Sequence, residues 1–230
     1  MFFPLKDENP TKTFPFMTIL FIVLNCLIYF IQFMLGRYGG AVLVAKYGVI
    51  PYEITRGIDL PPKGLLGPYI NLITSLFLHG SLLHLLGNMW FLWIFGNNIE
   101  DIVGHFKFVV FYILGGTAAS LLQIFLTSGS TVPIIGASGA VSAVLGAYML
   151  RFPRARVKTL LFIIIFVTVI NVPAITFIGI WFVFQLLNSL RTASSNVAWF
   201  AHIGGFLFGL FFVKVFEKKK RSKKNRYRVY

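Results

Sequence analysis

The chain has 230 residues, of which 57% are hydrophobic and only 12% are charged, and its mean hydropathy is +0.80. A soluble domain of this length could not cover so much apolar surface, so the composition excludes an ordinary soluble enzyme or binding domain. The net charge of +14 is compatible with nucleic-acid binding, but most of the excess lies in short segments beside hydrophobic runs. That placement is typical of the cytoplasmic flanks of membrane helices. We therefore expect an integral membrane protein that binds no nucleic acid.

Long charge-free runs predict the helices, because roughly 20 apolar residues cross a bilayer as a helix. We expect an all-α protein whose six transmembrane helices span about 14–35, 78–96, 108–126, 136–150, 173–190 and 197–216. The corresponding domain division is a short polar lead at 1–12, a membrane domain at 13–216 and a basic tail at 217–230. Lead and tail are both expected on the cytoplasmic side.

Three stretches between or within these helices are less regular. Residues 36–72 mix charges, prolines and aromatics, and we expect a partly structured loop at the membrane surface. The β-branched run at 160–170 is interpreted as a buried or interfacial segment after a basic loop at 151–158. The fourth helix is only about 22 Å long at 1.5 Å per residue, short of the roughly 30 Å hydrocarbon core. One of its ends is therefore expected below the surface, in a cavity.

The basic residues predict the orientation. With six spans, 16 of the 21 Lys and Arg residues fall on the side of the two termini. The positive-inside rule then places both termini in the cytoplasm. We expect an integral protein of a bacterial plasma membrane.

Four polar side chains stand out in three of the predicted helices, and polar groups in such helices are costly and usually functional. They are Ser138 in the fourth helix, His202 in the sixth, and His84 with Asn88 in the second. All three helices run inward in this orientation, so the four residues share the outer half of the membrane. A neutral imidazole within about 3 Å of a hydroxyl can remove its proton and create a nucleophile. Since no carboxylate occurs at this depth, the sequence predicts a Ser138–His202 dyad.

Small residues indicate how the dyad would be assembled. Two stripes at helical spacing are Ser138, Ser142 and Gly146 in the fourth helix, and His202, Gly205 and Gly209 in the sixth. Such stripes let membrane helices approach closely, so Ser138 and His202 should meet near the outer surface. His84 and Asn88, one helical turn apart, would offer N–H groups to a developing oxyanion, together with the backbone amide of Ser138.

At this point the sequence resembles the rhomboid family of intramembrane serine proteases. The residues that carry the resemblance are His79-Gly-Ser-Leu-Leu-His84-Leu-Leu-Gly-Asn88, Gly136-Ala-Ser138-Gly139, Ala201-His202-Ile-Gly-Gly205 with Gly209, Glu100 with Gly104, and Trp181-Phe182. The resemblance implies Ser138 as nucleophile, His202 as general base, and His84, Asn88 and the Ser138 amide as oxyanion donors. It implies structural roles near the site for His79, Gly136, Gly139, Gly205 and Gly209.

One position departs from the family pattern. Many members have an aromatic residue four positions after the nucleophile, where its ring stacks on the catalytic histidine, and this chain has Ser142 there. Either a hydroxyl orients His202 or another aromatic ring stacks on it.

The expected function is a serine endopeptidase that cleaves other membrane proteins in or near their outer membrane half, without metal or cofactor. Its expected partners are single-span or other membrane-protein substrates and the bilayer, and substrates would arrive laterally past Trp181 and Phe182. The first alternative is a non-catalytic rhomboid-like protein that binds and escorts membrane proteins. That alternative predicts loss of the Ser–His pair, which is intact in this sequence. A small-solute transporter would need inverted repeats and a midplane site, and neither is evident in the sequence.

Overall fold

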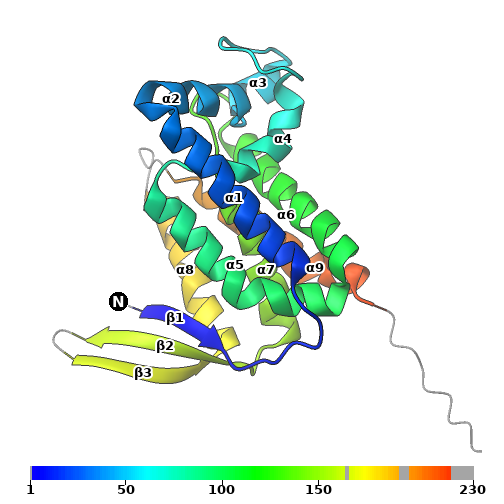
Figure 1. Cartoon of the computed structure of the whole chain (residues 1–230), viewed down its shortest axis with the longest axis vertical. Helices are drawn as coiled ribbons and strands as arrows, with labels where there is room; N and C mark the ends of the chain where they lie inside the picture. Colours follow the sequence, from blue (N-terminus) through cyan, green and yellow to red (C-terminus); the bar gives the residue numbers. More distant parts are fainter. Residues whose placement is uncertain (1, 164–165, 192–196, 219–230) are drawn as a thin grey trace, which may run out of the picture.

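The computed structural model describes residues 2–163, 166–191 and 197–218 and is predominantly helical. Its long helices pack alongside one another, with short helices at one end and a small sheet at the other (Figure 1). The elements are β1 (Phe2–Asp7), α1 (Phe16–Met34), α2 (Gly36–Tyr47), α3 (Pro51–Arg56), η1 (Pro68–Ile70), α4 (Asn71–Thr74), η2 (Ser75–Phe77), α5 (Leu82–Val103), α6 (His105–Leu126), α7 (Ser138–Arg151), β2 (Arg156–Ile163), β3 (Phe166–Pro173), α8 (Ala174–Arg191) and α9 (Trp199–Phe216).

Each of the six predicted helices is present, as α1 and α5 to α9. Within the described residues, α1, α6 and α9 are long and apolar enough to cross a membrane. Residues 68–77 and α5 form a fourth candidate span that is bent by 79°. Helix α7 has only 14 residues, and the apolar part of α8 is also short. The structure thus supports a multi-helix membrane protein, while the count of six spans stays a prediction.

Helix α5 continues past the predicted end at residue 96 because its last turns bind the start of the chain. The buried carboxylate of Glu100 accepts hydrogen bonds from the backbone N–H groups of Met17 and Thr18, at 2.9 and 2.8 Å, and from the Thr18 hydroxyl at 2.7 Å. These amides open α1 and have no carbonyl partner within the helix. A distant acidic residue therefore caps α1, where its negative charge also suits the helix dipole.

Helix α7 lies at the centre of the bundle, and every residue from Gly139 to Tyr148 is buried. A methyl group added to Gly205 of α9 would overlap the carbonyl oxygen of Gly139, and one added to Gly209 would overlap that of Ala143. A step of four residues along α7 thus matches a step of four along α9, so the two helices run parallel in backbone contact. This is the close approach that small residues permit in membrane helices, as the stripes predicted.

The all-α prediction is wrong at one end of the molecule, where a three-stranded antiparallel sheet has the order β1-β2-β3. The expected polar lead contains β1, which pairs with β2 through contacts such as Phe2 with Leu161. The basic loop and the β-branched run form β2 and β3, paired from Arg156 with Pro173 to Ile163 with Phe166. β-branched residues fit the pleated surface of a sheet, which is why this run forms a hairpin instead of a simple interfacial segment.

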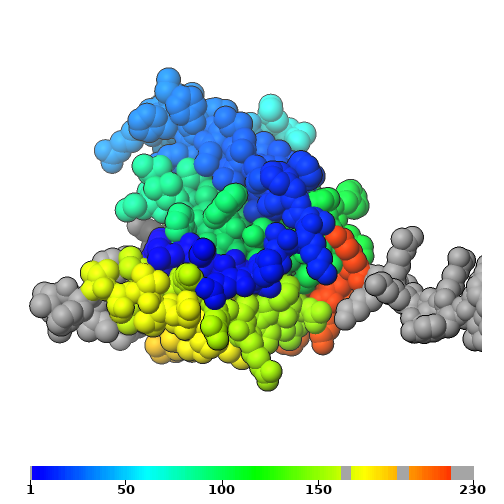
Figure 2. All heavy atoms as spheres, turned by 60° about the horizontal axis from the view of Figure 1, so that its bottom comes forward, coloured from blue at the N-terminus to red at the C-terminus, as the bar shows by residue number. Residues whose placement is uncertain are grey.

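Aromatic contacts attach the sheet to the bundle. The Phe2 ring stacks on Phe177 of α8 at 4.8 Å, and the Phe3 ring on Trp90 of α5 at 5.5 Å. The indole N–H of Trp90 also donates to the carbonyl of Pro4 at 2.7 Å. Figure 2 shows the blue N-terminal segment lying beside the yellow-green segment of the hairpin on this face. The N-terminal strand is therefore an integral layer of the fold.

The C-terminal end of α9 reaches the same end of the molecule. The backbone N–H of Lys218 donates to the carbonyl of Ile102 at 3.0 Å, and Glu217 pairs with Arg151 at the end of α7. Both described ends of the chain thus lie near the sheet, whereas α5, α7 and α9 all begin at the opposite end. Apart from Glu217 and Lys218, the predicted basic tail lies outside the described residues.

The region 36–72, expected to be a partly structured loop, holds α2, α3 and the short turns before α5. Helix α2 has no buried residue, so it lies on the surface of the bundle. The side chain of Gln32 bonds the backbone N–H and C=O of His79 at 3.1 and 3.2 Å, which ties the end of α1 to the turn before α5.

Candidate functional site

Ser138 is the first residue of α7, where backbone N–H groups have no partner within the helix. The turn before it depends on Gly136, whose φ of +120° favours glycine. The N–H of Gly136 donates to the carbonyl of Ser75 at 2.9 Å, which holds this turn against the segment before α5. Ser138 is only partly buried, so its hydroxyl lies at the accessible end of an otherwise buried helix.

His84 and Asn88 face this turn from α5. A methyl group added to Gly136 would lie 2.7 Å from ring atoms of His84 and 3.7 Å from Nδ2 of Asn88. Glycine is therefore required here for a second reason, because the turn touches the imidazole. The predicted oxyanion donors thus lie against Gly136, which precedes Ser138 by two residues in the chain.

His79 packs beneath these donors. Its Nε2 lies 2.9 Å from Nδ2 of Asn88, and its ring meets the ring of His84 edge-on at 5.0 Å. Because an amide NH2 group can only donate, Nε2 of His79 accepts this hydrogen bond. One N–H of Asn88 is thus held in place by His79, and the other is left for a further acceptor.

His202 lies in the first turn of α9 and is contacted by α8. Its Nδ1 lies 2.9 Å from Oε1 of Gln185, and its ring lies 6.2 Å from the ring of Trp181 at an angle of 36°. The Trp199 ring meets it edge-on at 5.9 Å.

The parallel packing of α7 and α9 sets the relation between Ser138 and His202. Gly139 meets Gly205, and these glycines follow Ser138 by one residue and His202 by almost one turn. Both residues therefore lie at the same end of the helix pair. Within the described part of the chain, no hydrogen bond joins the Ser138 hydroxyl to the His202 ring.

The departure at position 142 has a structural explanation. The hydroxyl of Ser142 donates to the backbone carbonyl of Ser138 at 2.7 Å, and among the described residues no hydrogen bond joins it to His202. The ring of His202 is instead placed by Gln185 and the two tryptophans. Sequence reasoning missed Gln185, although one signal was present: a polar amide inside an apolar helix, one turn after Trp181. In the described residues, no group of three or more His, Cys, Asp or Glu side chains is placed to hold a metal ion.

The fold and this site define an α-helical integral membrane protein with a cluster of polar residues at one end of its helical bundle. The model of the Rhomboid domain matches residues 67–219, and the chain belongs to the rhomboid family. This span contains every residue that the sequence singled out for the site.

Three relatives illustrate the match. The chain is 30% identical over 149 residues to the presenilin-associated rhomboid-like protein, mitochondrial, of Mus musculus, which covers 62% of this chain and 37% of the relative. It is 31% identical over 167 residues to rhomboid protein 1, mitochondrial, of Saccharomyces cerevisiae, covering 67% and 45%. It is 27% identical over 218 residues to rhomboid protease GluP of Bacillus subtilis, covering 90% and 38%.

The matched region is less than half the length of each of these relatives. Two of them carry mitochondrial names, so the comparisons do not support the expected bacterial plasma membrane. They do support an integral membrane protein.

Proposed function

We propose that this chain is an intramembrane serine endopeptidase that cleaves membrane-protein substrates through Ser138 and His202. One observation carries the proposal. The backbone contact between Gly139 and Gly205 brings the start of α7 and the first turn of α9 together, beside His84 and Asn88. Acyl transfer needs a nucleophile, a base and oxyanion donors in one place, and these residue types supply all three.

In the proposed reaction the Ser138 hydroxyl attacks the carbonyl carbon of the scissile peptide bond, and His202 takes the hydroxyl proton. The tetrahedral intermediate collapses when the C–N bond breaks and His202 gives its proton to the leaving amine. Water then attacks the acyl-enzyme, with His202 again as base, and releases Ser138. Peptide hydrolysis by these steps needs no further reagent.

The developing negative charge would be stabilised by three donors. They are the backbone N–H of Ser138 at the start of α7, the ring of His84 and the N–H of Asn88 that does not bond His79. One such donor typically lowers the barrier by about 2.7–4 kcal/mol. The hydrogen bond to His79 already orders the Asn88 side chain before a substrate binds.

The basic residues support the orientation of the site. The predicted cytoplasmic residues gather around the sheet and the last turns of α7 and α9, where both described chain ends lie. Ser138 and His202 open their helices at the opposite end, so the proposed cleavage takes place in the membrane half away from the termini. This assignment follows the positive-inside rule.

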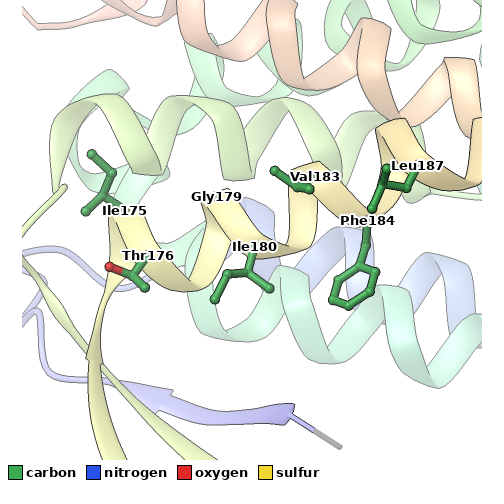
Figure 3. A pocket seen from close by; sticks show the side chains of 7 residues that line it. All are labelled: Ile175, Thr176, Gly179, Ile180, Val183, Phe184 and Leu187. Carbon is green, nitrogen blue, oxygen red and sulfur yellow. The ribbon is translucent and has the colours of Figure 1, made fainter.

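Helix α8 is the proposed route of substrate access. An apolar groove runs along its outer face between Ile175 and Leu187 (Figure 3). On the inner face, Phe182 stacks on Phe206 at 4.1 Å and Trp181 adjoins His202. A substrate segment that reached the site past α8 would therefore displace or pass Trp181 before meeting His202.

The test is cleavage of a panel of single-span membrane proteins by the purified chain in liposomes. Wild-type protein should cut some of them, and Ser138→Ala and His202→Ala should cut none while remaining folded. A fluorophosphonate probe should label wild-type Ser138 and neither variant. If Ser138→Ala cleaved as fast as wild type, the protease proposal would fall. Binding of the same substrates without cleavage by wild type would favour the escort alternative.

A further inference from the structure

The contact between Gln185 and His202 has no counterpart among the residues singled out from the sequence. Gln185 lies on α8 and is only 6% exposed, although the opposite face of α8 is apolar and exposed. A buried amide is costly unless its N–H and C=O groups are bonded. Its Nε2 donates to the carbonyl of Trp181 at 3.1 Å, and its Oε1 lies 2.9 Å from Nδ1 of His202.

These two bonds determine which way round the amide lies. The carbonyl of Trp181 can only accept, so the atom that faces it must be the NH2 group of Gln185. The oxygen of Gln185 is then the atom that faces His202. Since an amide oxygen can only accept, Nδ1 of His202 must carry a proton.

A proton on Nδ1 determines what the other ring nitrogen can do. In a neutral imidazole one nitrogen donates and the other accepts, so Nε2 of His202 holds a free electron pair. That nitrogen is the one able to take the proton of the Ser138 hydroxyl. The opposite tautomer would present an N–H to the hydroxyl and could not act as a base.

We propose that Gln185 is a positioning residue that holds His202 in the Nδ1–H tautomer, with Nε2 unprotonated for Ser138. The inference rests on the proposed protease function and adds a third member to the dyad. The amide oxygen fulfils the orienting part of the role that a carboxylate has in a triad. Being neutral, it stabilises the protonated imidazole less than a carboxylate would. The rings of Trp181 and Trp199 lie beside the His202 ring, with centroids 6.2 and 5.9 Å away.

The decisive measurement is the tautomer of His202 itself. Nitrogen NMR of histidine-labelled protein in micelles, with His202→Ala to assign the signals, should show Nδ1 protonated and Nε2 unprotonated in wild type. Gln185→Met keeps the side-chain length and removes the acceptor, so the signals should move toward the Nε2–H form. Gln185→Glu should keep Nδ1 protonated. Asn188→Leu is the matched control. Asn188 lies three residues after Gln185 on α8, and its side-chain NH2 donates to the backbone carbonyl of Phe184 in the same helix at 2.7 Å.

The second measurement is the rate of fluorophosphonate labelling of Ser138 against pH. Gln185→Met should label about ten- to a hundredfold more slowly than wild type, in line with the cost of a misplaced catalytic group. Gln185→Glu should restore much of the rate and move the acidic limb of the profile to higher pH, because a carboxylate stabilises the protonated ring. Asn188→Leu should keep the wild-type profile. Thermal unfolding checks that each variant is folded.

The outcomes separate this inference from the function on which it rests. If Gln185→Met kept the wild-type tautomer, or if wild type already showed Nε2 protonated, the inference would be wrong whatever the activity. If the tautomer followed Gln185 but wild-type protein neither labelled nor cleaved, the positioning role would stand and the protease proposal would fail.

Discussion

The hydroxyl of Tyr148, near the end of α7, donates a 2.6 Å hydrogen bond to the carboxylate of Asp7 at the end of β1. Asn98 of α5 donates to the same oxygen at 2.8 Å. Asp7 therefore joins the N-terminal strand to the two helices whose opposite ends carry Ser138 and His84.

Burial raises the pKa of Asp7 above its ordinary value of 3.8, although the hydrogen bonds from Tyr148 and Asn98 oppose the shift. A carboxyl whose pKa is higher in the folded than in the unfolded state binds protons preferentially when folded. The free energy of unfolding should therefore rise as pH falls through the folded pKa of Asp7 toward 3.8. Asp7→Asn should remove this part of the pH dependence in thermal unfolding measured in detergent. An unchanged pH dependence in Asp7→Asn would contradict the assignment.

Tyr148→Phe should weaken the same junction. It removes a hydrogen bond to a charged group, which typically costs about 1.5–3 kcal/mol of stability, and the loss should shrink at low pH as Asp7 becomes protonated. Chemical unfolding in mixed micelles at two pH values would measure this. Fluorophosphonate labelling of the folded variant should stay near the wild-type rate, because Tyr148 lies at the other end of α7 from Ser138.

Glu100→Gln should lower stability without affecting the chemical step. The two carboxylate oxygens accept from Met17, Thr18 and, at 2.5 Å, Nδ1 of His105, whereas an amide would turn an NH2 group toward at least one of these donors. An unsatisfied buried group of this kind costs about 1–3 kcal/mol. The midpoint of thermal unfolding should fall, while labelling of Ser138 per folded molecule should not. A folded Glu100→Gln protein with a strongly reduced labelling rate would contradict this separation.

Gly205→Ala should separate α7 from α9. The added methyl group would overlap the carbonyl oxygen of Gly139, a backbone atom that cannot move aside without shifting the start of α7. We expect both a loss of stability and a loss of Ser138 labelling of at least about tenfold, since a displacement near 1 Å can cost far more. Gly87→Ala is the matched control, because a methyl group there meets nothing within 4 Å. Equal labelling rates in the two variants would show that the helix contact does not position the dyad.

Asn88→Ala should give a graded loss of activity, in contrast to Ser138→Ala. The His84 ring and the Ser138 amide remain as oxyanion donors, so we expect a cost of up to about 3 kcal/mol, or roughly a hundredfold in rate. The loss should appear in kcat for a cleaved substrate more than in KM, because the donor acts on charge that develops in the transition state. A change confined to KM would assign Asn88 to substrate binding instead.

Ser138→Cys, in a Cys26→Ala background, tests the orientation. A water-soluble, membrane-impermeant thiol reagent should modify the new cysteine only from the side opposite the chain termini. Lys12→Cys, at an exposed position whose backbone N–H donates to Asp101 near the end of α5, is the control that should react only from the other side. Reaction of both cysteines from one side would overturn the orientation.

The sequence by itself determined the six long helices and the order of the polar residues along them. Inside a bilayer no water is present to bond the backbone N–H and C=O groups. A long apolar segment therefore forms an α-helix, because a helix satisfies these groups within the segment itself. The glycine stripes likewise showed which faces of α7 and α9 would meet, because small side chains at four-residue spacing permit backbone contact whatever surrounds them. The residues proposed for catalysis were singled out as polar side chains within apolar helices.

Only the tertiary structure decided the contacts between segments that local pattern does not link. β1 pairs with β2 across some 150 residues of chain, and nothing in the polar lead marks it as a strand before its partner is present. Glu100 caps α1 from 82 residues away, and Gln185 meets His202 across a helix boundary. In each case the partner of a strand or of a polar side chain depends on how whole helices pack together. That packing depends on the shapes of many side chains together, which the hydropathy of any single segment does not contain.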